Sequence, residues 1–256
     1  MVNLGLERAN LIENYYGFEN GITGKDLFET GIKQAKRLGV EVRKEEVIKV
    51  ELVPEGIKVK TDKEEYKGKA LILATGSERN KPKIKGIEKF EGKGVSYCAI
   101  CDGFFYRGKD VAVLGNGNYA ISETNDLINV AKEVTILTDG KSAPEFRAGN
   151  VKTKTDKIKE VRGIEKVEEI EFEDGSTMKI DGVFVAQGEA TSIDFAKKLG
   201  IITNKNKIVV NENMETNIKG IYACGDCIGG LLQVSKAVSD GAIAGLQVIN
   251  YIKANK

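Results

Sequence analysis

The sequence predicts an α/β protein, and three features of the chain carry this prediction. Residues 70–74 form a strand that is apolar on both faces, which is typical of a sheet covered on both sides. Residues 110–137 read as a strand, a Gly-rich turn, a helix and a second strand, the unit from which parallel sheets are built. The length of 256 residues suits one large or two modest domains that fold without cross-links.

The other elements follow from apolar periodicity and from turn residues. Helices are predicted where apolar residues recur at helical spacing: residues 25–38, about 119–131 and about 233–252. Strands are predicted where apolar residues alternate with polar ones or run together: the antiparallel meander of 41–66, then 110–114, 133–137 and several short strands before 185. Asp174 and Gly175 mark a hairpin turn among those short strands.

The composition excludes several classes of function. The 39 basic and 38 acidic residues give a formal net charge of +1, so neither nucleic acid nor an acidic membrane surface is indicated as a partner. No apolar run is long enough to cross a bilayer and no signal peptide is recognisable, so we expect a cytoplasmic protein. Histidine is absent, so proton transfer must fall to Asp, Glu, Lys, Tyr or Cys.

A dinucleotide-binding pattern lies within residues 110–137. Gly115, Gly117 and Ala120 follow a strand and open a helix, where backbone N–H groups face a pyrophosphate. A Rossmann-like fold with an unused turn is the alternative. Asp139 follows the next strand, 24 residues after Gly115, where a carboxylate would bind a ribose 2′-hydroxyl and repel a 2′-phosphate. We therefore expect NADH to be preferred to NADPH, although a polar residue that merely ends the strand fits equally well.

The four cysteines lie in two Cys-x-x-Cys pairs, Cys98 with Cys101 and Cys224 with Cys227. In a cytosolic chain such pairs indicate redox or metal chemistry more often than structural disulfides. Two thiols at this spacing can close a disulfide ring, and the carboxylate of Asp102 is placed to exchange a proton with them. A zinc site of all four sulfurs is the competing hypothesis, but the 122 residues between the pairs far exceed the spacing of zinc ribbons. The thioredoxin fold also carries this motif, in a smaller chain without a nucleotide-type unit.

Residues 94–106 (Gly-Val-Ser-Tyr-Cys-Ala-Ile-Cys-Asp-Gly-Phe-Phe-Tyr) resemble the redox-site segment of bacterial low-molecular-weight thioredoxin reductases. Three further segments resemble the same family in the same order: 12–18 beside the flavin ring, the turn of 73–76, and 216–226 of the C-terminal flavin motif. The resemblance covers nearly the whole chain.

The resemblance implies two Rossmann-like, three-layer domains. The FAD-binding domain would be discontinuous, comprising residues 1–106 and 187–256, and the NAD(P)-binding-like domain would comprise 107–186. A homodimer and a rotation between the domains are also implied. Compared with the family, the first domain lacks its N-terminal βα unit, since no Gly-x-Gly-x-x-Gly turn precedes Leu11. We therefore expect weakened FAD binding.

The resemblance also assigns a role to each site residue. Cys101 would face the flavin and Cys98 would attack the substrate disulfide, with Asp102 as the acid–base partner. FAD would be bound by residues from four segments of the chain: Asn14, Thr75, Gly76, Gly225, Asp226, Gln233 and Val234. Cys224 and Cys227 fall in the flavin loop and are interpreted as packing residues.

Electrons are therefore expected to pass from a donor to FAD, then to the Cys98–Cys101 disulfide, and then to thioredoxin or a thioredoxin-like protein. The basic segment that holds NADPH in the family is not found at residues 138–144, so the NAD(P)H site is interpreted as eroded and ferredoxin is an alternative donor. Three other interpretations fit the same residues: a related oxidase or peroxide-reducing flavoenzyme, an inactive fragment of a reductase, and a zinc-bound structural protein.

Overall fold

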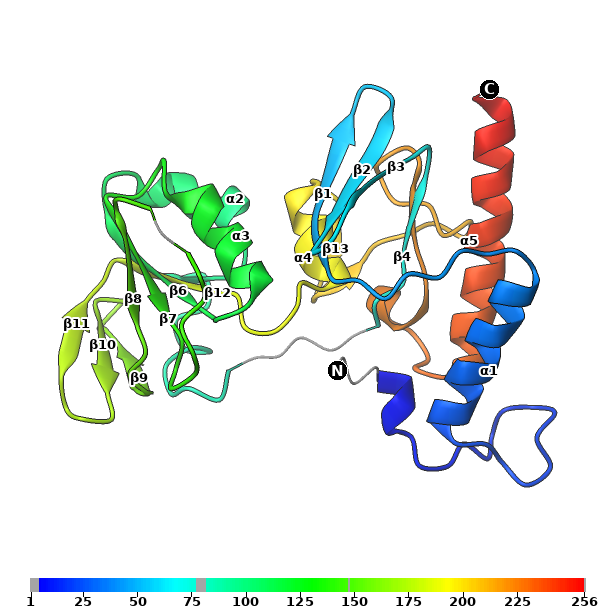
Figure 1. Ribbon diagram of the computed structural model, residues 1–256, viewed down its shortest axis with the longest axis horizontal. Coiled ribbons are helices and arrows are strands. Elements are labelled where there is room, and N and C mark those ends of the chain that lie inside the picture. The colour runs from blue at the N-terminus through cyan, green and yellow to red at the C-terminus, as the bar shows by residue number, and fades with distance from the viewer. Residues whose placement is uncertain (1–4, 77–81, 147, 256) are drawn as a thin grey trace.

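The computed structural model describes residues 5–76, 82–146 and 148–255, and it places them in two α/β domains side by side (Figure 1). We refer to residues 82–189 as the inserted domain. Residues 5–76 together with 190–255 make up the discontinuous domain. Each domain has its own apolar core, and the predicted α/β class with a parallel-sheet core is confirmed.

The inserted domain is built on a five-stranded parallel sheet with the order β5-β12-β6-β7-β8. Its strands are β5 (Val95–Ser96), β6 (Asp110–Leu114), β7 (Glu133–Leu137), β8 (Val151–Lys154) and β12 (Gly182–Val185). The predicted strands 110–114 and 133–137 are confirmed with the same ends, because both are apolar on two faces and flanked by charged residues.

Three layers follow from the alternation of side chains along β6. Val111 and Val113 point to one face and pack with helix α3 (Asn118–Leu127). Ala112 and Leu114 point to the other face and pack against an antiparallel sheet. That sheet consists of β9 (Ile158–Arg162), β10 (Glu169–Phe172) and β11 (Thr177–Lys179). The predicted turn joins β10 to β11, and the Asp174 carboxylate accepts hydrogen bonds from the N–H and hydroxyl of Ser176.

The segment before residue 107 packs with the inserted domain, although we predicted it in the first domain. Strand β5 pairs in parallel with β12, and Ile87 and Phe90 are buried in the core beneath the sheet. The redox-site segment follows as the short helix α2 (Ala99–Asp102) and the 3-10 turn η2 (Gly103–Tyr106). The Tyr106 ring packs edge-on against Phe184 at 5.3 Å between centroids, which anchors this segment to the sheet.

The discontinuous domain joins chain segments that are far apart in the sequence. Strand β4 (Leu71–Leu73) pairs in parallel with β15 (Ile221–Ala223), and the meander is the sheet β1 (Val47–Val53), β2 (Gly56–Thr61) and β3 (Glu65–Gly68). The remaining elements are η1 (Gly5–Arg8), α1 (Gly24–Arg37), α4 (Ser192–Lys198), β13 (Thr203–Asn204), β14 (Lys207–Ile208), η3 (Gly225–Ile228) and α5 (Val234–Ala254). The predicted first and last helices are thus confirmed as α1 and α5.

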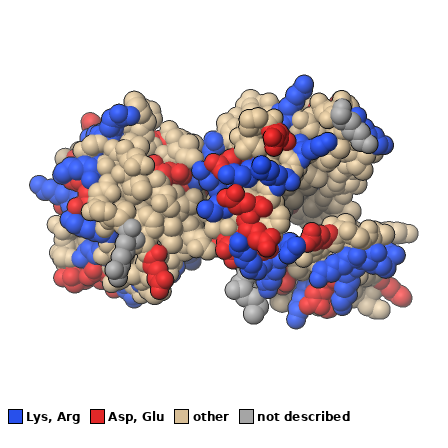
Figure 2. All heavy atoms as spheres, turned by 45° about the horizontal axis from the view of Figure 1, so that its top comes forward, with Lys and Arg blue, Asp and Glu red and all other residues tan. Residues whose placement is uncertain are grey.

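The surface carries both signs of charge. Figure 2 shows Lys and Arg side chains interspersed with Asp and Glu over both domains on the face drawn, in keeping with the near-zero net charge. Within the described ranges, no helix is both long enough and apolar enough to cross a membrane.

Candidate active site

Cys98 and Cys101 form a disulfide at the start of α2, with their Cα atoms 5.3 Å apart. Cys98 is the N-cap of this helix, and its sulfur accepts a hydrogen bond from the Cys101 N–H at 3.2 Å. Only 2% of the Cys98 surface is exposed, whereas Cys101 is exposed to solvent. In this arrangement of the domains Cys101 is therefore the accessible sulfur, and Cys98 is covered.

Asp102 is tied to the redox turn through Ser96. The Ser96 hydroxyl donates to the Asp102 carboxylate at 2.7 Å and accepts the Cys98 N–H at 3.1 Å. A carboxylate held in this way stays beside the sulfur pair in a fixed orientation, as a proton acceptor requires. Sequence reasoning missed Ser96, which lies two residues before the first cysteine and carried no separate signal.

Glu123 of α3 supports the same turn from the side. Its carboxylate accepts the Ala99 N–H at 2.7 Å, and it forms an ion pair with Lys198 of α4. Burial raises the pKa of Glu123, while the Lys198 ammonium opposes this rise. We did not predict either residue, because their partners lie in distant segments of the chain.

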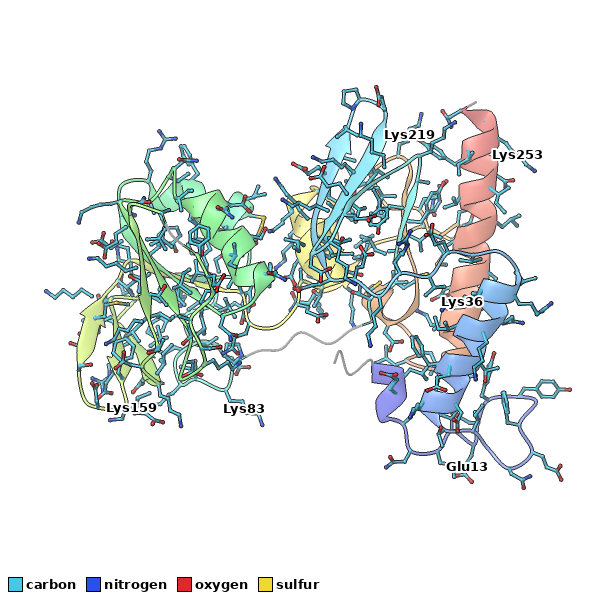
Figure 3. All side chains as sticks on the ribbon, viewed as in Figure 1. Glu13, Lys36, Lys83, Lys159, Lys219 and Lys253 are labelled. Carbon is cyan, nitrogen blue, oxygen red and sulfur yellow. A yellow bond between two sulfur atoms is a disulfide. The ribbon has the colours of Figure 1, made fainter. Side chains whose placement is uncertain are left out.

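Two residues predicted to bind FAD meet across the discontinuous domain. The Asn14 amide donates to the Gln233 side-chain oxygen at 2.8 Å, although 219 residues separate them. Gln233 is the N-cap of α5 and Val234 is its first residue. A shallow hollow lined by residues 13–19 lies in the same loop, and Figure 3 labels Glu13 there.

The predicted Ala-Thr-Gly turn closes onto the start of α4. The Thr75 hydroxyl lies 2.7 Å from the Ser192 hydroxyl and accepts the Ser192 N–H at 2.7 Å. Gly76 has a φ of 77°, a left-handed conformation that other residues adopt only with strain. The turn therefore links the end of β4 to α4 at the boundary between the domains.

The loop of η3 is held from beneath by α5. The Gly225 N–H donates to Asp240 at 3.1 Å, and Lys236 donates to the carbonyl oxygens of Gly225 and Gly229 at 3.0 and 2.6 Å. The Asp226 carboxylate is half-buried and has no hydrogen-bond partner among the described residues, so it has free acceptors for hydroxyl groups. The free acceptors of Asp226 and the paired amides of Asn14 and Gln233 are polar groups of the kind that FAD can bind.

The second cysteine pair has a different environment. Cys224 and Cys227 are free, buried thiols, and Cys227 donates to the carbonyl oxygens of Leu73 and Cys224 at 3.4 and 3.2 Å. Burial raises the pKa of Cys224 to about 11 and also raises that of Cys227. Both thiols are therefore protonated near neutral pH and are poor nucleophiles. The two cysteine pairs lie in different domains, so the structure does not bring the four sulfurs together.

The glycine turn of the inserted domain is tightly packed. A Cβ atom on Gly115 would lie 2.2 Å from the Ala186 carbonyl oxygen and 2.9 Å from the Ala120 Cβ. Gly115 and Ala120 therefore allow the close strand–helix approach expected of a dinucleotide fold. Gly117 is the N-cap of α3, and there the nearest neighbour to an added Cβ would be 3.8 Å away.

Two acidic residues, Glu46 and Asp139, are engaged in hydrogen bonds within the protein. The Glu46 carboxylate, from the discontinuous domain, accepts a hydrogen bond from the Asn118 side chain at 3.0 Å, at the first residue of α3. Burial raises the pKa of Glu46, and Glu189 and Asp62 add to this rise. Asp139 accepts the Ile158 N–H at 2.9 Å, so one of its oxygens is already used within the protein.

Known proteins resemble this chain over nearly its whole length. Residues 1–241 match the pyridine nucleotide-disulphide oxidoreductase family. The "34.2 kDa protein in rubredoxin operon" of Clostridium pasteurianum is 36% identical over 94% of this chain and 83% of its own length. The thioredoxin reductase of Bacillus subtilis is 34% identical over 94% of this chain and 81% of its own length.

Two solved structures extend the comparison. The atypical thioredoxin reductase TRi from Desulfovibrio vulgaris Hildenborough superposes with a TM-score of 0.88, with 38% identity over 98% of this chain and 87% of that one. A ferredoxin-flavin thioredoxin reductase from Clostridium acetobutylicum superposes with a TM-score of 0.66, with 34% identity over 97% and 86%. The chain belongs to the pyridine nucleotide-disulphide oxidoreductase family, among its thioredoxin reductases, and the resemblance predicted from the sequence is confirmed.

Proposed function

We propose that this chain reduces the disulfide of thioredoxin, or of a thioredoxin-like protein, through bound FAD and the Cys98–Cys101 pair. The observation that carries the proposal is the disulfide at the start of α2, with Asp102 held beside it by Ser96. Sulfur pairs of this kind exchange electrons with other disulfides through thiolate attack.

The chemistry divides between the cofactor and the chain. FAD, when bound, supplies the electron pair that reduces the Cys98–Cys101 disulfide, and two protons complete the two thiols. The Cys98 thiol loses its proton, and the thiolate attacks the partner's disulfide, forming a mixed disulfide and releasing one partner thiolate, which takes up that proton. The Cys101 thiol then gives its proton to Asp102, and its thiolate attacks the Cys98 sulfur, which restores the disulfide. The second partner thiolate is released and takes up the proton from Asp102, so that the partner leaves fully reduced.

Two features support these roles. The Cys101 N–H donates to the Cys98 sulfur, and such a bond favours the thiolate. Phe104 and Phe105 are 68% and 70% exposed and lie three and four residues after Cys101, so they offer an apolar surface to a protein partner. Because Cys98 is covered, we propose that α2 must leave its present surroundings before exchange occurs.

The electron donor is a separate part of the proposal. The Glu46 carboxylate is hydrogen-bonded to Asn118, the first residue of α3, and would repel a pyrophosphate there. Asp139 already accepts a hydrogen bond from a backbone N–H. These contacts favour a reduced protein donor such as ferredoxin over NADH or NADPH. Anaerobic mixing of the FAD-loaded chain with each donor tests this, since rapid flavin bleaching by NADH or NADPH alone would contradict it.

We also propose that the chain forms a homodimer and works in the cytoplasm. The free thiols of Cys224 and Cys227 are compatible with a reducing compartment. Analytical ultracentrifugation of the FAD-loaded chain tests the first statement, and a monomer at micromolar concentration would contradict it.

The experiment that tests the proposed function uses chemically reduced flavin, so that it does not depend on the donor. The chain is loaded with FAD, photoreduced anaerobically and mixed with oxidised thioredoxin, and thioredoxin thiols are counted by alkylation and mass spectrometry. About one reduced thioredoxin per reduced flavin is expected. No thioredoxin thiols above those of a Cys98→Ser/Cys101→Ser control would contradict the proposal.

A further inference from the structure

Glu123 and Lys198 come from different domains and meet in the interior. Glu123 lies on α3 of the inserted domain, and Lys198 is the last residue of α4 in the discontinuous domain. Their side chains are 1% and 4% exposed. Figure 1 shows α3 and α4 facing each other where the two domains approach. We propose that this interdomain ion pair is a positioning device that keeps the redox helix α2 against the discontinuous domain and so keeps Cys98 covered.

A single carboxylate connects three elements. One oxygen of Glu123 accepts the Ala99 N–H, at the first residue of α2, and the other binds the Lys198 ammonium. The position of α2 relative to α4 therefore depends on one side chain that holds both. Because α2 contains Cys101 and begins directly after Cys98, any shift between α3 and α4 also moves the sulfur pair.

This contact contains more acidic groups than basic ones. Asp126, one turn along α3, lies 3.6 Å from the same ammonium and is only partly exposed. Two carboxylates thus share one cation, and burial raises the pKa of both carboxyl groups. Loss of the Lys198 charge would leave two acidic groups near each other, with only the Lys49 charge still acting on Asp126, which is costly in a buried site.

The physics of a buried ion pair suits a contact that opens and closes. Bringing two charges out of water costs about as much as their attraction returns, so separation into water is not strongly opposed. The hydrogen bond between Glu46 and Asn118 is a second polar contact between the domains, and each domain keeps its own apolar core. Polar contacts between domains are typical of domains that move relative to each other.

The inference rests on the proposed function only for what an uncovered Cys98 thiol is used for. The effect of the ion pair on access to Cys98 does not depend on that function. We expect Lys198→Met to uncover Cys98. Lys198→Arg keeps the charge and should behave like the wild type. Lys253→Met is the matched control, because it removes the same charge from the far end of α5, where Figure 3 labels this lysine.

The measurement is the alkylation rate of each cysteine, which requires neither FAD nor a partner. Each protein is reduced with dithiothreitol, desalted anaerobically and treated with iodoacetamide, and labelled peptides are followed over time. In the wild type Cys101 should react faster than Cys98. In Lys198→Met the Cys98 rate should rise by about tenfold or more, because loss of one partner of a buried pair shifts the equilibrium at least that far. An unchanged Cys98 rate in a folded Lys198→Met protein would overturn the proposal.

Cys224 reports on folding in the same experiment, because it is buried and should stay unlabelled in every folded variant. If Cys224 is also alkylated in the Lys198→Met protein, the measurement is made on Glu123→Gln in place of Lys198→Met. In Glu123→Gln the new side chain still offers an acceptor to the Ala99 N–H, and Lys198 still has Asp126 as its ion-pair partner. A rise of roughly threefold or more at Cys98 alone is then expected, and no rise would overturn the proposal. A chain that shows this pattern but fails to reduce thioredoxin would contradict only the proposed function.

Discussion

The side chains of Asn14 and Gln233 are hydrogen-bonded at 2.8 Å, although the two residues lie near opposite ends of the chain. This bond joins the loop before α1 to the start of α5 and fixes the place where we expect the flavin ring. The loop and the helix start must both be in place for the ring to be held from two sides.

We expect Asn14→Ala to weaken FAD binding by roughly five- to tenfold, the effect of losing about one hydrogen bond. The bond also orders Gln233, so Gln233→Ala should give a loss of similar size. Flavin fluorescence during titration of the apoprotein measures the affinity. Lys253→Met, a change in an exposed residue at the far end of α5, is the control. Affinities of Asn14→Ala and Gln233→Ala equal to that of the control would contradict this placement of the ring.

Lys236 should be required for the stability of the flavin loop. Its ammonium donates to the Gly225 and Gly229 carbonyl oxygens and pairs with the buried carboxylate of Asp240 at 2.8 Å. In Lys236→Met the Asp240 charge loses its counter-ion, so the free energy of unfolding should fall by about 2–3 kcal/mol in urea titrations. The control Lys253→Met should change it by less than about 0.5 kcal/mol. Equal stabilities of the two variants would show that the Lys236 contacts contribute nothing.

The buried thiol of Cys224 should make the protein less stable in alkali. Its pKa is raised from 9.0 to about 11, so the folded state favours the protonated thiol. Below pH 9 the thiol is protonated in both states and the contribution is fully present. As the pH rises from 9 to 11, the unfolded state ionises first, and about 2 kcal/mol of stability is lost. Urea titrations over this range should show a steeper loss for the wild type than for Cys224→Ala, and parallel curves would refute the assignment.

Glu46 should control access to the glycine turn of the inserted domain. Its carboxylate lies at Asn118, where a pyrophosphate would otherwise meet the start of α3. We expect Glu46→Ala to bind NADH several-fold more tightly than the wild type, measured by isothermal titration calorimetry. Glu46→Gln keeps a hydrogen-bond acceptor for Asn118 and separates the effect of charge from that of bulk. No gain in either variant would mean that Glu46 does not exclude the dinucleotide.

The longer elements of the fold were predictable from the sequence, and the short ones were not. Strands β6 and β7 are apolar on both faces, so their ends were visible in the sequence. Helices α2 and α4 have four and seven residues, too few to show a helical period. Strand β5 has only two residues, and its pairing with β12 depends on contacts across nearly ninety positions, so the domain to which it belongs could not be read locally.

The residues of the candidate site that belong to local sequence motifs were predictable. The residues whose roles depend on tertiary contacts were not. The positions of the cysteine pair and the flavin loop follow from local patterns, and the Cys98–Cys101 disulfide agrees with the first of these. The roles of Glu123 and Lys198 depend on burial and on a partner 75 residues away. A Glu within an otherwise ordinary amphipathic helix gives no sign in the sequence that it will be buried.

The most direct test of the central claim is to trap the mixed disulfide. Cys101→Ser leaves Cys98 as the attacking thiol and removes the thiol that would resolve the intermediate. Incubated with oxidised thioredoxin, the reduced variant should form a covalent complex that dithiothreitol breaks, and peptide mass spectrometry should place the bond at Cys98. If instead Cys98→Ser forms the complex through Cys101, or if neither variant forms one, the assigned roles or the reductase function itself would be contradicted.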